Sequence, residues 1–297
     1  MIVRVLGSAA GGGVPQWNCA CTNCAAARRG DQPRRLQSSL AVSADGERWV
    51  LLNVSPDIAA QIEAHPPLLP TGVRGTPIVS MLLTDANVDH IGGLATLRQA
   101  GNHRFTVRSS AIVRDIAVAQ PAFAPFAQPP HRWLTGDAGE LEPADGDPVG
   151  TALRVRAISV PGLTPGFAGR RAVRGAVTAY AIDGGSGTLL FAPVFAAVDP
   201  QLAAEIRAAD VVFLDGSFFT DDEMRARGAG DKRASALGHA PLDGPGGTLA
   251  AIGTAHARCF VTHVNNTNPI LDPASGAAAL LARHQVEVAA DGLVLEL

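Results

Sequence analysis

Short hydrophobic runs rich in β-branched residues alternate along the chain with longer amphipathic or alanine-rich runs. The short runs predict strands over residues 2–6, 39–43, 48–54, 78–83, 105–108, 153–160, 177–182, 188–192, 211–214, 258–262, 286–289 and 293–297. Asp45-Gly46 separates the second and third of these runs, and this dipeptide is typical of a hairpin turn. The alternation of strands and helices predicts an α/β fold with helices outside packed sheets.

Predicted helices begin at a recurring polar-proline signal. Ser55-Pro56-Asp57, Asp199-Pro200 and Asp272-Pro273 precede helical runs over residues 58–64, 201–208 and 276–284. Further helices are expected after His90, after Ala111 and over residues 247–253. Residues 120–150 are rich in Pro, Gly and Asp without a clear period, so we expect a long surface excursion there, with a lid as one possible role. No domain boundary is visible, and we expect one domain spanning residues 1–297.

Composition excludes several classes of protein. The chain has 297 residues, 47% of them hydrophobic, which is enough to bury a sizeable core. Its net charge of −3 is too small and of the wrong sign for a generic nucleic-acid binder. No apolar run approaches the ~18 residues that a membrane span needs. The first residues, MIVRVLGS, do not resemble a secretory signal, so we expect a cytoplasmic protein.

Three of the four cysteines lie within six residues. Cys19, Cys21 and Cys24 form a C-x-C-x2-C pattern, whereas Cys259 stands alone in a predicted strand. Three such thiols cannot all pair with one another, and a reducing compartment disfavours disulfides. A closed structural zinc site needs a fourth ligand from a distant segment. The alternatives are an iron–sulfur site, which lacks a clear fourth cysteine, and cysteines that serve only as small core residues.

A second cluster of polar residues follows the strand predicted at residues 78–83. The stretch IVSMLLTDANVDHIGG resembles the H-x-H-x-D-H-x-G-G signature of the metallo-β-lactamase superfamily, with Asp85 and Asn87 in place of the two leading histidines. Asp89 and His90 are retained. Two further landmarks of that superfamily are lost, because Leu163 and Val194 stand where ligands are expected, whereas His263 still ends a strand as the C-terminal ligand does.

The retained residues point to one metal ion. A two-metal hydrolase needs a bridging carboxylate and about six or more protein ligands, which this chain cannot supply. Asp89, His90 and His263 instead form the ligand set of a mononuclear non-haem Fe(II) site with open positions. The alternative is an inert remnant in which both histidines are hydrogen-bonded in the core.

Two long motifs carry a more specific resemblance. Residues 7–19, GSAAGGGVPQWNC, and residues 263–271, HVNNTNPIL, closely resemble the family of pyrroloquinoline quinone biosynthesis protein B. The resemblance runs end to end and implies the four-layer αββα metallo-β-lactamase sandwich. It also implies an iron-dependent hydroxylase of the tyrosine ring in a cross-linked Glu–Tyr diamino acid cut from a precursor peptide. By similarity to phosphodiesterases with the same cysteine loop, His239 becomes the fourth zinc ligand. The alternatives are a catalytic histidine, as in other branches of the superfamily, and a plain surface histidine.

The expected mechanism uses Fe(II) at Asp89, His90 and His263 to bring dioxygen to the phenol ring of this substrate. Asp215 and Asp85 lie in the same predicted mouth, where each could orient a ligand, bind substrate or shuttle protons, or could be an ordinary strand-end or loop carboxylate. Carboxylates on the substrate suggest arginine partners, with Arg170, Arg171 and Arg174 as candidates. The rival functions are a non-catalytic carrier for transport of the cofactor or its precursor towards the periplasm, and a two-metal hydrolase or phosphodiesterase. No nucleic-acid or membrane partner is expected, and a homodimer is left open.

Overall fold

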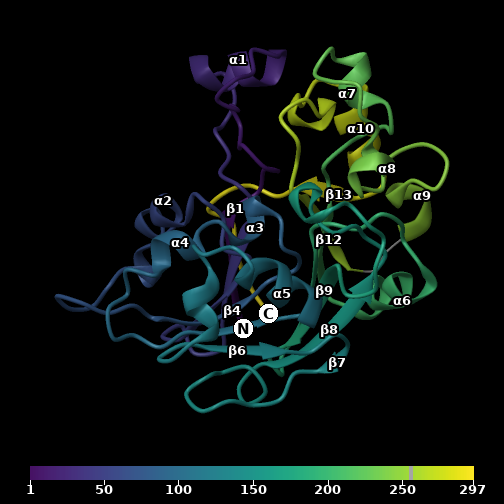
Figure 1. The fold of residues 1–297 in the computed structure, drawn as a ribbon. Helices are drawn as coiled ribbons and strands as arrows, with labels where there is room; N and C mark the ends of the chain where they lie inside the picture. The colour runs from purple at the N-terminus through teal and green to yellow at the C-terminus, as the bar shows by residue number, and fades with distance from the viewer. Residues whose placement is uncertain (254–256) are drawn as a thin grey trace.

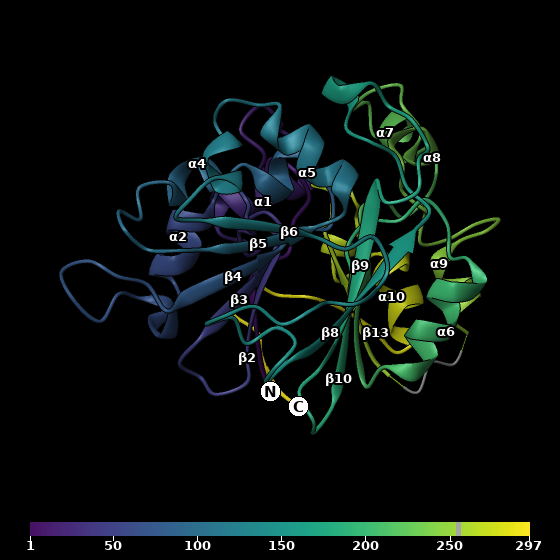
Figure 2. The same cartoon turned by 60° about the horizontal axis from the view of Figure 1, so that its bottom comes forward.

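Two facing β-sheets form the centre of the molecule, with helices on their outer faces (Figures 1 and 2). The computed structural model describes residues 1–253 and 257–297. The first sheet has the order β14-β1-β2-β3-β4-β5-β6, and the second has the order β13-β12-β11-β10-β9-β8-β7. The four-layer αββα sandwich is therefore confirmed.

Every strand predicted from the sequence is present with small shifts at its ends. The first sheet contains β1 (Ile2–Gly7), β2 (Ser39–Ser43), β3 (Trp49–Leu52), β4 (Ile78–Leu82), β5 (Thr106–Ser109), β6 (Arg132–Thr135) and β14 (Val294–Glu296). The second contains β7 (Gly139–Glu140), β8 (Arg154–Val160), β9 (Val177–Asp183), β10 (Thr188–Ala192), β11 (Val211–Asp215), β12 (Arg258–Thr262) and β13 (Val286–Val288). The hairpin at Asp45-Gly46 joins the antiparallel pair β2 and β3.

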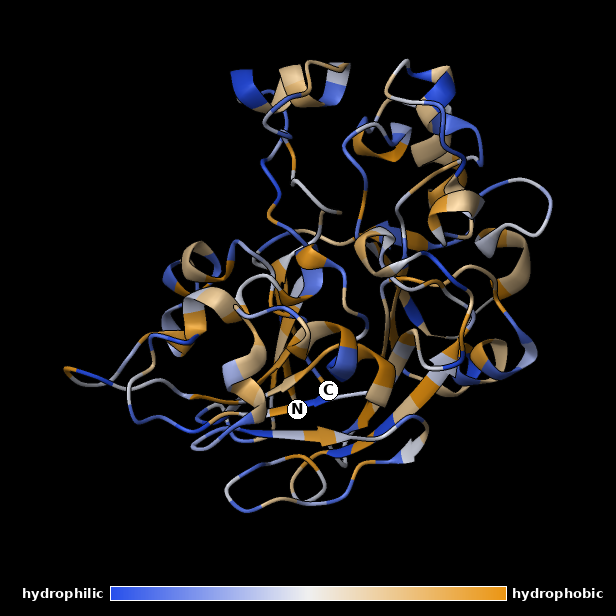
Figure 3. Cartoon of the chain, in the orientation of Figure 1, coloured by the Kyte–Doolittle hydropathy of each residue, from blue (hydrophilic) through white to orange (hydrophobic). Residues whose placement is uncertain are grey.

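Alternation of side chains along the strands divides the core into three layers. On β3, Val50 and Leu52 face the space between the sheets, whereas Trp49 and Leu51 face the outer helices. The same alternation on the second sheet separates the cluster between the sheets from the cluster beneath its helices. In Figure 3 the ribbon is coloured by hydropathy, and hydrophobic residues appear in orange along the strands. Because a strand's side chains alternate with a period of two, each sheet buries both faces.

The helices are short and mostly begin where the sequence predicts. They are α1 (Thr22–Arg29), α2 (Ile58–Glu63), α3 (Val88–Ile91), α4 (Leu94–Leu97), α5 (Ala111–Val118), α6 (Pro200–Ala208), α7 (Glu223–Ala226), α8 (Ala234–Leu237), α9 (Thr248–Ile252) and α10 (Gly276–Arg283). Asp199 caps α6 by accepting a hydrogen bond from the Leu202 amide. The helical run predicted from residue 276 is confirmed as α10, but Ser275 rather than Asp272 provides its cap. Within the ranges that the structure describes, no helix is both long and apolar enough to cross a membrane.

Residues 120–150 run mostly over the surface, as predicted, but the segment also contributes two edge strands that were not predicted. β6 extends the edge of the first sheet beside β5, and β7 pairs with β8 at the edge of the second. Asp147 is buried and accepts a hydrogen bond of 3.0 Å from Nε of Arg108 on β5. The segment is therefore anchored to both sheets at a few points, whereas most of its residues stay exposed or half-buried.

Candidate metal centres

The loop after β4 presents the altered signature motif at one end of the sandwich. Asp85 is fully buried, and its Oδ2 lies 2.6 Å from Nδ1 of His90. Its Oδ1 accepts hydrogen bonds of 2.8 Å from both the backbone and the side-chain amide of Asn87. Both carboxylate oxygens are thus used within the loop, and Asp85 orients His90 rather than facing the cluster itself.

His263 reaches the same place from the second sheet. It directly follows β12 and adopts a left-handed backbone conformation with φ 56°, which is uncommon for a residue other than glycine. Ser217 Oγ lies 2.8 Å from its Nδ1, so Nε2 of the ring faces Asp89. A strained conformation held by a side-chain partner is characteristic of functional positions.

Asp89, His90 and His263 converge as expected from the sequence. Each offers one ligand atom, and the three atoms lie within 4.8 Å of one another. Asp89 Oδ2 is 3.1 Å from Nε2 of His263 and 3.9 Å from Nε2 of His90. His90 Nε2 is buried and has no hydrogen-bond partner among the residues that the structure describes, which is costly in a folded protein. A cation bound by these three residues would satisfy that nitrogen, so the donor set fits a metal ion.

The charges of the triad reinforce one another. Burial lowers the pKa of His90, but the carboxylates of Asp85 and Asp89 outweigh this effect and raise it to about 9. Burial likewise opposes ionisation of Asp89, yet His90 and the hydrogen bond with His263 hold its pKa well below the usual range. The site is therefore an ionised carboxylate among imidazoles, and a metal ion would take the place of protons on the rings.

Asp215 and His239 lie on the other side of His263. Asp215 ends β11, and its Oδ2 is 2.7 Å from Nδ1 of His239. Its Oδ1 accepts hydrogen bonds of 2.6 Å from Ser217 Oγ and 2.9 Å from the Ser217 amide. Asp215, His239 and His263 offer ligand atoms within 4.8 Å of one another, which makes a second candidate group that shares His263.

A cavity of about 600 Å³ opens beside these residues. Asp89, His239 and His263 line it on one side. Cys19 and Cys21 line it as well, together with Met224 and Arg227 from the α7 region. Two members of the candidate triad, Asp89 and His263, thus border a space of the size that small-molecule ligands occupy.

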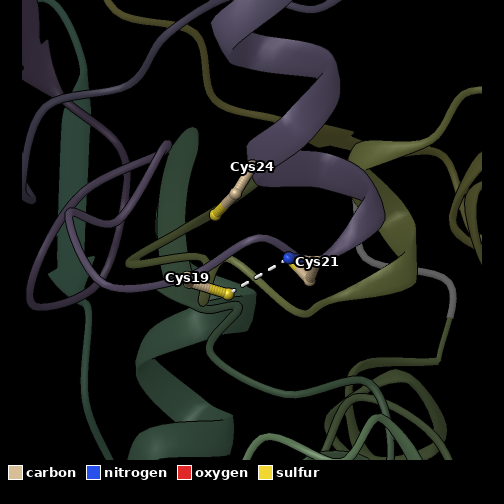
Figure 4. A group of neighbouring side chains, drawn as sticks. All are labelled: Cys19, Cys21 and Cys24. Atoms are coloured by element: carbon tan, nitrogen blue, oxygen red, sulfur yellow. Dashed lines mark hydrogen bonds between the residues drawn. The ribbon is translucent and has the colours of Figure 1, made fainter.

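The three cysteines form a group of their own. Cys24 lies in the first turn of α1, and Cys19 and Cys21 lie on the loop before it (Figure 4). Their sulfur atoms are within 4.8 Å of one another. Burial raises the pKa of Cys24 to about 11, so a nearby cation is needed for all three to act as thiolates. The soft donors and their convergence fit a zinc ion.

The structure does not bring His239 to the cysteines. Its Nδ1 is taken by Asp215 and lies 3.1 Å from Ser217 Oγ, in the group that contains His263. The side-chain amide of Asn266 contacts the cysteines instead. The expected place of His239 as a fourth zinc ligand is therefore corrected, because similarity in sequence does not report which way the residue after Gly238 turns.

The arginines proposed as substrate partners are also misplaced. Arg170 donates to the carbonyl of Ala236, whereas Arg171 and Arg174 line other hollows. In the part of the chain covered by the structure, Arg227 is the one basic side chain among arginine and lysine that lines the cavity beside the triad. Ser217, Asn266 and Arg227 were missed by sequence reasoning. Ser217 follows the strand-end Asp215, and Asn266 lies in the long motif after His263, so both had a local signal.

Comparison with known proteins identifies the family and the fold of this chain. The chain matches the family model described as a beta-lactamase superfamily domain over residues 48–264. It is 40% identical to coenzyme PQQ synthesis protein B of Ectopseudomonas mendocina and 41% identical to that of Azoarcus sp., with full coverage of both chains in each case. The structure is similar to that of Zn²⁺-bound PqqB from Methylobacterium extorquens, with a TM-score of 0.92, 38% identity and full coverage. A diphosphatase of the PhnP family shares the fold, with a TM-score of 0.70 at 19% identity over 100% of this chain and 96% of that one.

Proposed function

Because this chain belongs to the coenzyme PQQ synthesis protein B family of the β-lactamase superfamily, we propose that it acts in PQQ biosynthesis as an iron-dependent hydroxylase. The substrate is the tyrosine ring of a cross-linked Glu–Tyr precursor. One observation carries the proposal: the buried, unpartnered Nε2 of His90 faces the same point as Asp89 and His263. Two imidazoles and one carboxylate leave coordination positions open for dioxygen and substrate.

The roles of the surrounding residues follow from their hydrogen bonds. Asp89, His90 and His263 would hold Fe(II), which when bound supplies the activation of dioxygen for ring hydroxylation. Asp85 keeps the proton on Nδ1 of His90, and Ser217 binds Nδ1 of His263, so both Nε2 atoms are directed at the cluster. Asp215 holds Nδ1 of His239 in the same way, which leaves the other ring nitrogen to exchange a proton with the phenol.

Arg227 is proposed to bind a carboxylate of the substrate. It lines the cavity, its side chain is solvent-exposed, and a diamino acid derived from Glu and Tyr carries several carboxylates. We predict that Arg227→Gln raises KM by roughly tenfold, equal to about 1.4 kcal/mol of binding, with a smaller effect on kcat. Steady-state kinetics measure this, with Arg225→Gln on the preceding helix α7 as the matched control. An unchanged KM contradicts the role.

The proposed reaction is tested by loading the purified protein with Fe(II) without oxygen, then adding dioxygen, a reductant and the cross-linked substrate. We expect oxygen uptake and a product heavier by one or more oxygen atoms, both lost in His263→Ala. Binding of the precursor without oxygen uptake, equal in His263→Ala, would indicate a carrier instead.

A two-metal hydrolase or phosphodiesterase is the second candidate. The group formed by Asp215, His239 and His263 favours it, because that group could hold a second ion beside the first. Against it, both carboxylate oxygens of Asp215 already accept hydrogen bonds, and Val194 stands where a bridging carboxylate is expected. Metal analysis of protein whose cysteine-bound zinc has been counted separately distinguishes them: one further ion supports the oxygenase, and two support the hydrolase.

A further inference from the structure

The tip of the Asn266 side chain lies against all three cysteine sulfurs at once. Its Nδ2 atom is 3.0 Å from Sγ of Cys19, 3.6 Å from Sγ of Cys21 and 3.3 Å from Sγ of Cys24. Zn–S bonds of about 2.3 Å and a Zn–O bond of about 2.1 Å at tetrahedral angles place the oxygen roughly 3.6 Å from each sulfur. The amide tip therefore sits near the fourth corner of a tetrahedron whose other corners are the sulfurs.

Turning the amide by 180° exchanges its two terminal atoms. This rotation puts the carbonyl oxygen Oδ1 where Nδ2 now lies, without moving the backbone. The oxygen has lone pairs to give to a cation, whereas the amide nitrogen is a donor of hydrogen bonds only. The amide nitrogen can donate hydrogen bonds to the three sulfur atoms when no metal is bound. The amide oxygen can instead coordinate a metal ion.

We propose that Asn266 Oδ1 is the fourth ligand of a zinc ion bound by Cys19, Cys21 and Cys24. Asn266 is held in place without the ion, because its backbone carbonyl accepts a hydrogen bond of 2.9 Å from the side chain of Asn23. The same Asn23 nitrogen is 2.9 Å from the carbonyl of Asn268. The helix that begins after Cys21 is thus already joined to the loop that carries the fourth ligand.

Binding of the zinc ion by Asn266 would also affect the neighbouring Asp89–His90–His263 cluster. Asn266 follows His263 by three residues, and the peptide between them leads directly from the end of β12 into the cysteine cluster. On the opposite side, the N-terminal glycine loop lies against Asp89, since a Cβ on Gly11 would be 3.1 Å from its Oδ2. The zinc ion therefore fixes both loops that border the Asp89–His90–His263 cluster. The inference does not depend on the reaction catalysed there.

The test compares zinc release in matched variants. Protein carrying His263→Ala, which removes the second cluster, is loaded with zinc, and transfer to a chromogenic chelator is followed. Adding Asn266→Leu, of nearly the same volume, is expected to speed release by about tenfold or more, whereas Asn266→Asp, which keeps an oxygen, retains slow release. His239→Ala is the control and is expected to leave the rate unchanged. Slow release in Asn266→Leu with fast release in His239→Ala would overturn the proposal.

A spectroscopic measurement remains decisive if Asn266→Leu does not fold. Zinc X-ray absorption on the His263→Ala protein is expected to show three sulfur neighbours and one oxygen, without the outer-shell scattering of an imidazole. A fourth sulfur or an imidazole signal would refute Asn266 as the ligand.

Discussion

At the scale of single residues, Asp85 illustrates how a lost ligand position acquires a different use. The resemblance to the superfamily motif puts Asp85 where a metal-binding histidine is expected. Its shorter side chain instead reaches Nδ1 of His90, 2.6 Å away, and is buried with that ring. Asp85 therefore orients His90, the side chain proposed to bind the metal, instead of being a ligand itself.

Asp85→Asn is predicted to weaken Fe(II) binding by about ten- to hundredfold, because it removes the charge that holds His90 in its orientation. Anaerobic titration against a competing chelator measures the affinity. Asp183→Asn, which removes a carboxylate from an ion pair with Arg154, serves as the control. Equal affinities for Asp85→Asn and the unaltered protein would show that the hydrogen bond does not matter.

Glu223 is a second residue whose environment makes a clear prediction. It is buried beside the cavity, and burial raises its pKa from 4.5 to about 7 despite hydrogen bonds from Thr267 and the Phe219 amide. A carboxyl group whose pKa is raised on folding contributes full stability below pH 4.5 and loses it as the pH rises through 7. Glu223→Gln is therefore expected to flatten the fall in unfolding free energy between pH 5 and 8. Urea unfolding at both values measures it, and a parallel fall in both proteins would contradict the assignment.

At the scale of elements, the tight connection between α3 and α4 determines the positions of Asp89 and His90. His90 lies on α3, and Gly93 precedes α4 against the loop that follows β3. A Cβ on Gly93 would lie 2.2 Å from the carbonyl oxygen of Ser55 and 2.8 Å from Cγ2 of Ile58. The close approach explains the glycine, because backbone atoms cannot yield as a flexible side chain would.

Gly93→Ala is expected to lower the unfolding free energy by about 1–3 kcal/mol, the usual cost of overpacking. Gly276→Ala at the first position of α10 is the matched control, because a Cβ there meets nothing within 4 Å. It should leave stability unchanged or raise it by about 0.5 kcal/mol. Chemical denaturation measures the unfolding free energy of both variants. Equal values would contradict the close packing proposed around Gly93.

At the scale of the whole molecule, the candidate site is assembled from both sheets. Asp89 and His90 follow β4 of the first sheet, whereas His263 follows β12 of the second. Bonds from one ion to these residues therefore join the two halves of the sandwich. A ligand that binds only the folded state stabilises it in proportion to the logarithm of its concentration over Kd.

We predict that anaerobic Fe(II) raises the Tm of zinc-loaded protein, with about 2.7 kcal/mol of stabilisation at a hundredfold excess over Kd. His263→Ala should abolish the rise, because the second half of the site is lost. Differential scanning calorimetry measures it, and the same rise in both proteins would place the bound iron elsewhere.

Local sequence patterns were sufficient to predict most helices and strands, but they did not predict β6 and β7 at the edges of the sheets. The strand runs and the cap at Asp199 depend on neighbouring residues, so they can be predicted from a short window. The edge strand β6 depends on pairing with β5, and the buried pair of Arg108 with Asp147 joins residues 39 positions apart. A short polar segment gives no signal of such a partner, which is why the edge strands within residues 120–150 were not predicted.

The sequence by itself determined the fold class and the candidate side chains for the chemistry: three clustered cysteines, and the Asp89, His90 and His263 that survive in an altered motif. Only the tertiary structure decided how these side chains are grouped. It assigned His239 to Asp215 and His263, Asn266 to the cysteines, and Arg227 to the cavity. The reason is physical: residue type determines which atoms a side chain can offer, whereas the crossing of loops from two sheets determines which atoms meet.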